Sequence, residues 1–63
     1  MSYITLERDK LVYEAEYFLD DGMVTVIGER GISNIDINGM SECVAARTGL
    51  RNLINQGLIE PKS

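Results

Sequence analysis

The stretch Lys10–Gly28, with the sequence KLVYEAEYFLDDGMVTVIG, carries the clearest structural pattern of this 63-residue chain. Apolar side chains alternate with other residues along its first half, and a run rich in β-branched residues fills its second half. Between the halves stands Asp21-Gly22, a pair that tolerates the positive φ angles of a tight two-residue turn. We therefore predict a β-hairpin in which Tyr17 lies opposite Val26.

The two faces of this hairpin differ in chemistry. One face is consistently apolar in the first strand, and we expect it to face the core: Leu11, Tyr13, Ala15, Tyr17 and Leu19. The other face mixes acidic residues with large apolar ones, namely Val12, Phe18, Met23 and Ile27. An exposed antiparallel face is normally less apolar than this, and one short helix can cover only one side of a sheet. We therefore predict that these four residues form an interface with another molecule.

Two further segments have the patterns of strands. Residues 32–37 alternate apolar and polar side chains between glycine turns, which predicts a third strand with one solvated side. Tyr3-Ile4-Thr5-Leu6 is a candidate for a short fourth strand at the edge of the sheet. The mixed charges of Glu7-Arg8-Asp9-Lys10 then indicate a solvated connection.

The hydrophobic period changes to 3.6 residues between Glu42 and Gln56, which predicts an amphipathic helix. Ser41 is a favourable N-cap, and Gly57 supplies the left-handed residue that commonly ends a helix. The expected apolar stripe comprises Cys43, Ala46, Leu50, Leu53 and Ile54. Gly49 costs about 1 kcal/mol relative to alanine in a helix. We therefore expect either a break into two short helices or a close approach of the helix backbone to the sheet.

Together these patterns predict a single α+β domain over residues 1–63. Its core would be a three-stranded antiparallel sheet, with room for a short fourth strand at the N-terminus. The C-terminal helix is expected to pack across the sheet face that carries Leu11, Tyr13, Tyr17 and Leu19.

A chain of this length buries only about 60% of the surface that its unfolded form exposes, so its stability is marginal. Small domains usually compensate with disulfides, a metal or a partner subunit. One cysteine and no histidine are present, which excludes an internal disulfide and the usual zinc ligand sets. We therefore expect oligomerisation, most simply a two-fold homodimer that covers the apolar residues of the second face.

Ten acidic and six basic residues give a net charge of −4. A charge of this sign repels a phosphate backbone, so nucleic acid is disfavoured as a partner. The sequence shows neither a signal-peptide pattern nor an apolar run long enough to span a bilayer. We expect a cytoplasmic protein with no membrane partner.

The residue types give little support to catalysis. Without histidine, neither a serine triad nor a Cys-His pair can be built. We expect Cys43 to be a buried apolar residue, because free cysteine is among the most buried residue types. Glu14 and Glu16 share one strand face, but a catalytic carboxylate pair needs burial to separate its pKa values. We expect them to be solubilising residues or partners of Arg47 and Arg51, and we predict no catalytic residue and no cofactor.

One stretch resembles the opening of a calcium-binding loop, Asn34-x-Asp36-x-Asn38-Gly39. The twelfth position of such a loop needs a bidentate glutamate, and here it is Ala45. We interpret the stretch as the end of a strand followed by a turn, and we predict no metal site.

Arg47 and Arg51 are four residues apart on the flank of the predicted helix, where two like charges are mildly unfavourable without an acidic neighbour. Carboxylates of the sheet are the ordinary partners for them, and a small anion or a phosphate is the alternative. Residues 44–61, VAARTGLRNLINQGLIEP, resemble a compressed helix-turn-helix. That resemblance implies a second helix that reads the major groove of DNA.

The sequence therefore predicts a small non-catalytic protein–protein interaction or assembly module. Its partner would be a second copy, giving a homodimer, or another protein. The alternative is a nucleic-acid-binding protein that uses the C-terminal helix with Arg47 and Arg51.

Overall fold

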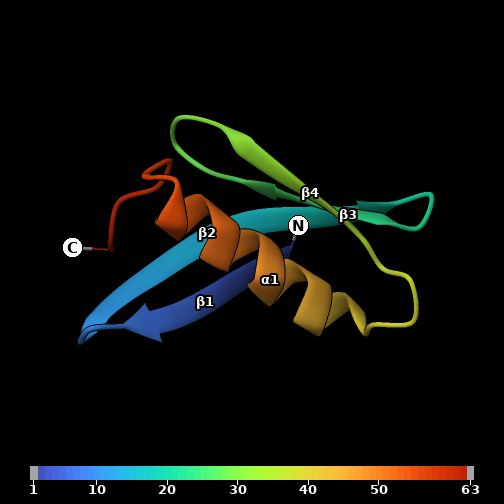
Figure 1. Ribbon diagram of the computed structural model, residues 1–63, viewed down its shortest axis with the longest axis horizontal. Coiled ribbons are helices and arrows are strands. Elements are labelled where there is room, and N and C mark those ends of the chain that lie inside the picture. The colour runs from blue at the N-terminus through green and yellow to red at the C-terminus, as the bar shows by residue number, and fades with distance from the viewer. Residues whose placement is uncertain (1, 63) are drawn as a thin grey trace.

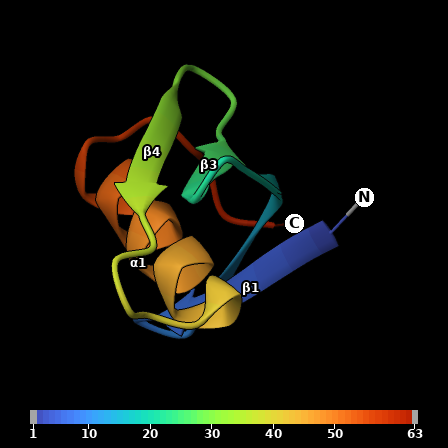
Figure 2. The same ribbon diagram turned by 90° about the vertical axis from the view of Figure 1, so that its right-hand side faces the viewer.

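The computed structural model describes residues 2–62. It contains an antiparallel sheet with the strand order β1-β2-β3-β4 and one helix packed on it (Figure 1). The elements are β1 (Ser2–Arg8), β2 (Leu11–Asp20), β3 (Met23–Ile27), β4 (Ile32–Asp36) and α1 (Glu42–Asn55). α1 lies against one side of the sheet, as the view along the molecule shows (Figure 2). The predicted α+β architecture is confirmed, and the candidate fourth strand is present.

Two tight turns fix the register of the first three strands. Asp21 and Gly22 have φ angles of 53° and 74°, as expected for a mirror-image hairpin turn. This turn pairs Tyr17 with Val26, as predicted. The turn between β1 and β2 has the same positive signs, with φ angles of 55° at Asp9 and 67° at Lys10.

β1 is longer than the sequence pattern indicated. All seven of its residues pair with β2, from Ser2 opposite Tyr17 to Arg8 opposite Leu11. The expected solvated connection is therefore only partly right, because Glu7 and Arg8 belong to the strand. The tight turn after β1 is hard to recognise from sequence, since lysine seldom adopts a positive φ.

The core lies between α1 and the sheet. The side chains that are fully buried there are Val24 and Val26 of β3 and Leu50 and Leu53 of α1. Two small helix residues, Ala45 and Ala46, are also buried and allow α1 to approach the strands. Most of the core of the described chain is therefore a single layer of side chains between α1 and the sheet, to which Ile59 of the C-terminal segment adds one buried side chain.

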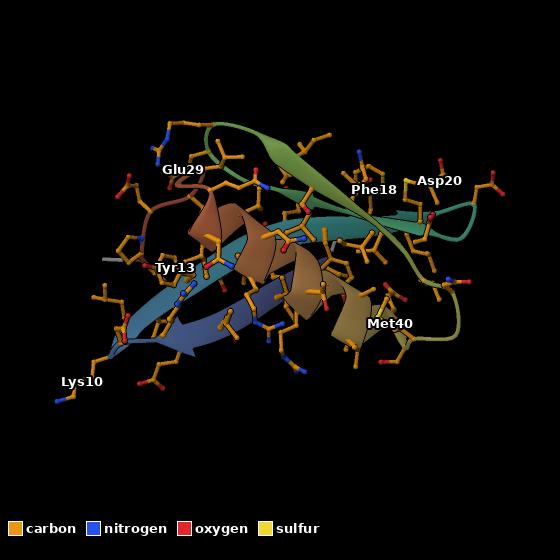
Figure 3. The ribbon with its side chains drawn as sticks, viewed as in Figure 1. Lys10, Tyr13, Phe18, Asp20, Glu29 and Met40 are labelled. Carbon is orange, nitrogen blue, oxygen red and sulfur yellow. The ribbon has the colours of Figure 1, made fainter. Side chains whose placement is uncertain are left out.

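The predicted packing face of β2 is only partly correct. Tyr17 is 7% exposed, and Tyr13 lies beside the C-terminal end of α1 (Figure 3). Leu11 and Leu19, in contrast, are 46% and 45% exposed. A ten-residue strand spans about 33 Å and a 14-residue helix about 21 Å. The helix is therefore too short to cover the leucines at both ends of β2.

Ser41 begins the helix as predicted. Its side-chain oxygen accepts a hydrogen bond of 3.2 Å from the backbone N–H of Val44. This bond satisfies one of the donors that the first turn of a helix leaves free.

Ser41→Ala is therefore expected to lower the free energy of unfolding by about 1 kcal/mol, as measured by urea denaturation. Thr48→Ala removes a hydroxyl that donates over 2.9 Å to the carbonyl of Val44 in the same helix; because such a bond adds little to a helix and alanine is the better helix former, the stability is expected to change by less than about 0.5 kcal/mol. Equal losses in the two variants would show that the cap contributes nothing specific.

Gly49 does not break the helix. α1 runs without interruption from Glu42 to Asn55, and Gly49 is buried against Val26 and Ile35 of the sheet. Of the two expectations for this glycine, close approach to the sheet is the correct one.

The chain reverses after α1 and returns along the sheet. Gly57, with a φ of 71°, ends the helix, and the backbone N–H of Leu58 donates to the carbonyl of Leu53 over 2.9 Å. This is the expected Schellman closure. Farther along, the N–H of Lys62 donates to the carbonyl of Val12 over 2.6 Å. The C-terminal segment therefore lies beside the first half of β2.

Candidate functional site

The sheet face that α1 does not cover is the main candidate for a functional surface. Side chains alternate between the two faces of a sheet, and Ile4, Tyr17, Val24 and Val26 point into the core. Their neighbours in sequence therefore point away from α1. We call this second surface the open face. It is formed by every other residue of each strand, and it includes Tyr3 of β1, Phe18 of β2, Ile27 of β3 and Ile32 of β4.

Strand pairing brings these four side chains together. Tyr3 lies opposite Glu16, Glu16 lies opposite Ile27, and Ile27 lies opposite Ile32. Three of the four apolar residues therefore lie in one row across the sheet, with Glu16 occupying the β2 position of that row. Phe18 is the next open-face residue of β2 and is diagonal to both Tyr3 and Ile27, within reach of large side chains. We call Tyr3, Phe18, Ile27 and Ile32 the apolar cluster. They are 62%, 46%, 39% and 54% exposed.

The four residues predicted to form an interface all lie on the open face and are all exposed: Val12, Phe18, Met23 and Ile27. Phe18 and Ile27 belong to the apolar cluster, and Met23 adjoins it on β3. Val12 stands apart, because Glu14 and Glu16 separate it from Phe18 on the same side of β2. Their use as an interface stays a prediction.

Sequence reasoning missed two members of the apolar cluster, Tyr3 and Ile32. Both lie on strands whose register could not be read from the hairpin alone. The signal for Tyr3 was its place in an alternating segment, Tyr3-Ile4-Thr5-Leu6, in which Ile4 takes the core position. Ile32 follows Gly31 directly and pairs with Ile27 across a short loop.

The open face is strongly acidic. Alternation and pairing place five carboxylates on it: Glu7, Glu14, Glu16, Asp20 and Asp36. One of these carboxylates forms an ion pair with a basic side chain, since Nζ of Lys62 lies 3.3 Å from Oε1 of Glu14. The ion pair is half exposed, so its contribution to stability is small. Apolar and acidic side chains therefore share one surface.

Arg47 and Arg51 lie elsewhere. Both are exposed on α1, on the opposite side of the sheet from Glu14 and Glu16. The expectation that these carboxylates are partners of the two arginines is therefore wrong, because the sheet itself separates them. Within residues 2–62 the structure shows no ion pair for either arginine. Their role as an anion contact stays a prediction.

Cys43 is exposed, not buried as expected. The buried positions of α1 are Ala45, Ala46, Gly49, Leu50 and Leu53. The predicted stripe included Cys43 because it lies three residues before Ala46 and seven before Leu50. The buried stripe instead includes Gly49, which packs against Val26 and Ile35 of the sheet, and Cys43 lies outside it.

The stretch that resembles a calcium loop has an ordinary structural role. Asn34 lies on the open face, where its Oδ1 accepts a hydrogen bond of 2.8 Å from Oγ1 of Thr25 on β3. Asn38 has a φ of 48° and forms part of the turn that leads to the helix. Residues 2–62 contain no group of acidic or cysteine side chains arranged to hold a metal ion.

The helix-turn-helix resemblance of residues 44–61 does not correspond to such a motif in the structure. One uninterrupted helix runs to Asn55, and the segment after Gly57 is not helical but is hydrogen-bonded to Arg30 and Val12. The turn expected at Gly49 is absent because that glycine allows helix-to-sheet contact and does not end a helix. The only helix of the described chain is also too short and too polar to cross a membrane.

The described part of the chain contains no pocket. No protein-family model matches this chain, and no curated protein and no solved structure is similar enough to it to count as a match. The chemistry of the open face is therefore the main indication of what class of protein this is.

Proposed function

We propose that this protein is a small, non-catalytic protein–protein interaction module that binds another protein chain through its open face. The observation that carries the proposal is the apolar cluster. Its four large side chains are contiguous across four strands and between 39% and 62% exposed. Apolar patches of this kind on small soluble domains commonly mark interaction surfaces.

Within residues 2–62, the large apolar residues exposed on the opposite side of the molecule lie apart from one another, since Leu11 and Leu19 are at the two ends of β2. Along the outward side of α1, Val44 is the one large apolar residue that is exposed, and Arg47 and Arg51 accompany it. Aromatic anchors are typical of interface centres, and Tyr3 and Phe18 both lie on the open face. This contrast supports the sheet, not the helix, as the binding surface.

The chemistry of the chain supports a binding role over a catalytic one. The sequence contains no histidine, and none of the open-face carboxylates is fully buried, as catalytic carboxylates with separated pKa values need to be. The same carboxylates repel a phosphate backbone. A protein partner is therefore favoured over a substrate or a nucleic acid.

Two kinds of protein partner would cover the open face. A second copy would use the same surface twice about a two-fold axis, with the two sheets stacked about 10 Å apart. A different protein would bring its own apolar surface. Either partner would remove the apolar cluster from water.

Site-specific photo-crosslinking tests the proposal without assuming which partner is correct. A benzophenone amino acid is placed at position 18 or 32 on the open face, and at position 51 on α1 as a matched exposed control. After irradiation in the cells that make the protein, we expect a discrete crosslinked product from positions 18 and 32 and none from position 51. Circular dichroism of each purified variant checks that the fold is intact. Absence of a product from the open face, or the same product from position 51, would refute the proposal.

A further inference from the structure

Glu16 stands in the middle of the apolar cluster. It pairs with Tyr3 on one side and with Ile27 on the other, and Phe18 follows it on the same side of β2. Glu16 is half-buried, whereas Glu14, the preceding open-face residue of the strand, is exposed. Any molecule that covers the apolar cluster must therefore also cover this carboxylate.

Within residues 2–62, no basic side chain is placed to neutralise Glu16 in such a contact. Lys62, at the margin of the open face, is paired with Glu14. Arg30 lies in the β3–β4 loop and is held by Oε2 of Glu60 at 2.8 Å. The remaining basic residues are on α1, in the β1–β2 turn or hydrogen-bonded to Asn55 on the helix side: Arg47, Arg51, Lys10 and Arg8. A buried carboxylate without a counter-charge strongly opposes association.

A second copy of the chain would add to the unfavourable burial of uncompensated negative charge. Stacking two open faces would bring a Glu16 from each copy into the contact, together with the acidic residues at its margins, such as Asp20 and Asp36. Like charges placed face to face disfavour a complex. Charge complementarity therefore requires a partner of the opposite sign.

We propose that the partner of the open face is a different protein with a basic amphipathic surface, whose apolar side chains cover the apolar cluster and whose Arg or Lys pairs with Glu16. This inference rests on the proposed function and adds the chemistry of the partner. Arginine fits the site best, because its guanidinium binds a carboxylate through two parallel hydrogen bonds and also stacks on aromatic rings such as Tyr3 and Phe18. Further basic residues at the rim would face the remaining carboxylates.

The test uses the whole protein and three short fluorescent amphipathic helical peptides. All three have the same leucine positions, and their polar positions are filled with arginine, glutamine or glutamate. We expect the leucine–arginine peptide to bind in an anisotropy titration and the other two not to bind. Glu16→Gln is expected to weaken this binding by about 10- to 100-fold. Asp21→Asn changes the net charge equally, lies in a turn that tolerates asparagine, and is expected to change the affinity by less than about twofold.

Three results would overturn the inference. Equal weakening by Glu16→Gln and Asp21→Asn would mean attraction to the overall charge and not to this site. Binding of the glutamine peptide as tightly as the arginine peptide would mean that Glu16 needs no cation. Self-association in sedimentation velocity that becomes tighter in Glu16→Gln would identify a homodimer, and would leave the proposed function standing. Failure of the proposed function is recognised separately, because open-face crosslinking does not depend on the partner's charge.

Discussion

Leu50→Ala is expected to lower the free energy of unfolding by about 2–5 kcal/mol, the largest effect of any single substitution considered for this protein. Leu50 is fully buried between α1 and the sheet, where truncation removes apolar contacts and leaves a cavity. A domain of 63 residues has a total stability of about 3–9 kcal/mol. The loss would therefore remove a large part of the stability, and a substantial unfolded fraction is expected at 25 °C if the wild-type stability lies at the lower end of this range. Urea denaturation followed by circular dichroism measures it.

Leu11→Ala is the matched control, because it makes the same chemical change at a residue that is 46% exposed. A cost of less than about 1 kcal/mol is expected there. If the two leucines proved equally costly to truncate, the packing of α1 on the sheet would differ from the one described.

Gly49→Ala is expected to destabilise the protein by about 1–3 kcal/mol, although alanine is the better helix former by about 1 kcal/mol. A Cβ at Gly49 would lie 2.6 Å from Cγ2 of Val26 and 3.4 Å from Cγ1 of Ile35. Valine has no flexible end that could move aside, so the helix must shift away from β3. Thermal and urea unfolding measure the loss.

Val26→Ala removes the clashing methyl and provides an internal check on this prediction. The double variant Gly49→Ala/Val26→Ala is expected to be more stable than the sum of the two single losses implies, because the cavity and the new methyl occupy the same space. Arg51→Ala, at an exposed position of the same helix, is expected to be nearly neutral. Stabilisation by Gly49→Ala would mean that helix propensity outweighs contact with the sheet.

Much of the fold could be predicted because local chemistry and pairing agree in the central hairpin. Asp21-Gly22 specifies one turn, and that turn fixes which side chains of β2 and β3 share a face. The helix ends were equally predictable, since Ser41 and Gly57 act through bonds to their own neighbours. These features depend on a few adjacent residues and can therefore be predicted from the local sequence.

Features that depend on how elements pack were predicted less well. The rotation of α1 about its axis follows from the contact of Gly49 with Val26, and the sequence stripe alone placed Cys43 on the wrong side. The solvent exposure of Leu11 follows from the relative lengths of helix and strand. Neither property is encoded in a local pattern.

The candidate surface also combines features that local sequence predicts with features that depend on how the strands are aligned. The hairpin pattern correctly placed Phe18 and Ile27 on the side away from the core. It could not place Tyr3 and Ile32, because their positions depend on the register of the outer strands. The central position of Glu16 in the apolar cluster likewise becomes visible only when all four strands are aligned.

The hydrogen bond between Lys62 and Val12 is also expected to affect how the protein behaves at high concentration. β3 pairs with β2 only from Glu16 to Asp20, which leaves the backbone groups of the first half of β2 free on that side. A bare strand border of this kind recruits strands from other molecules and seeds fibrils. The hydrogen bond from Lys62 to Val12 occupies part of this border, so we expect the C-terminal segment to hinder the addition of a foreign strand there.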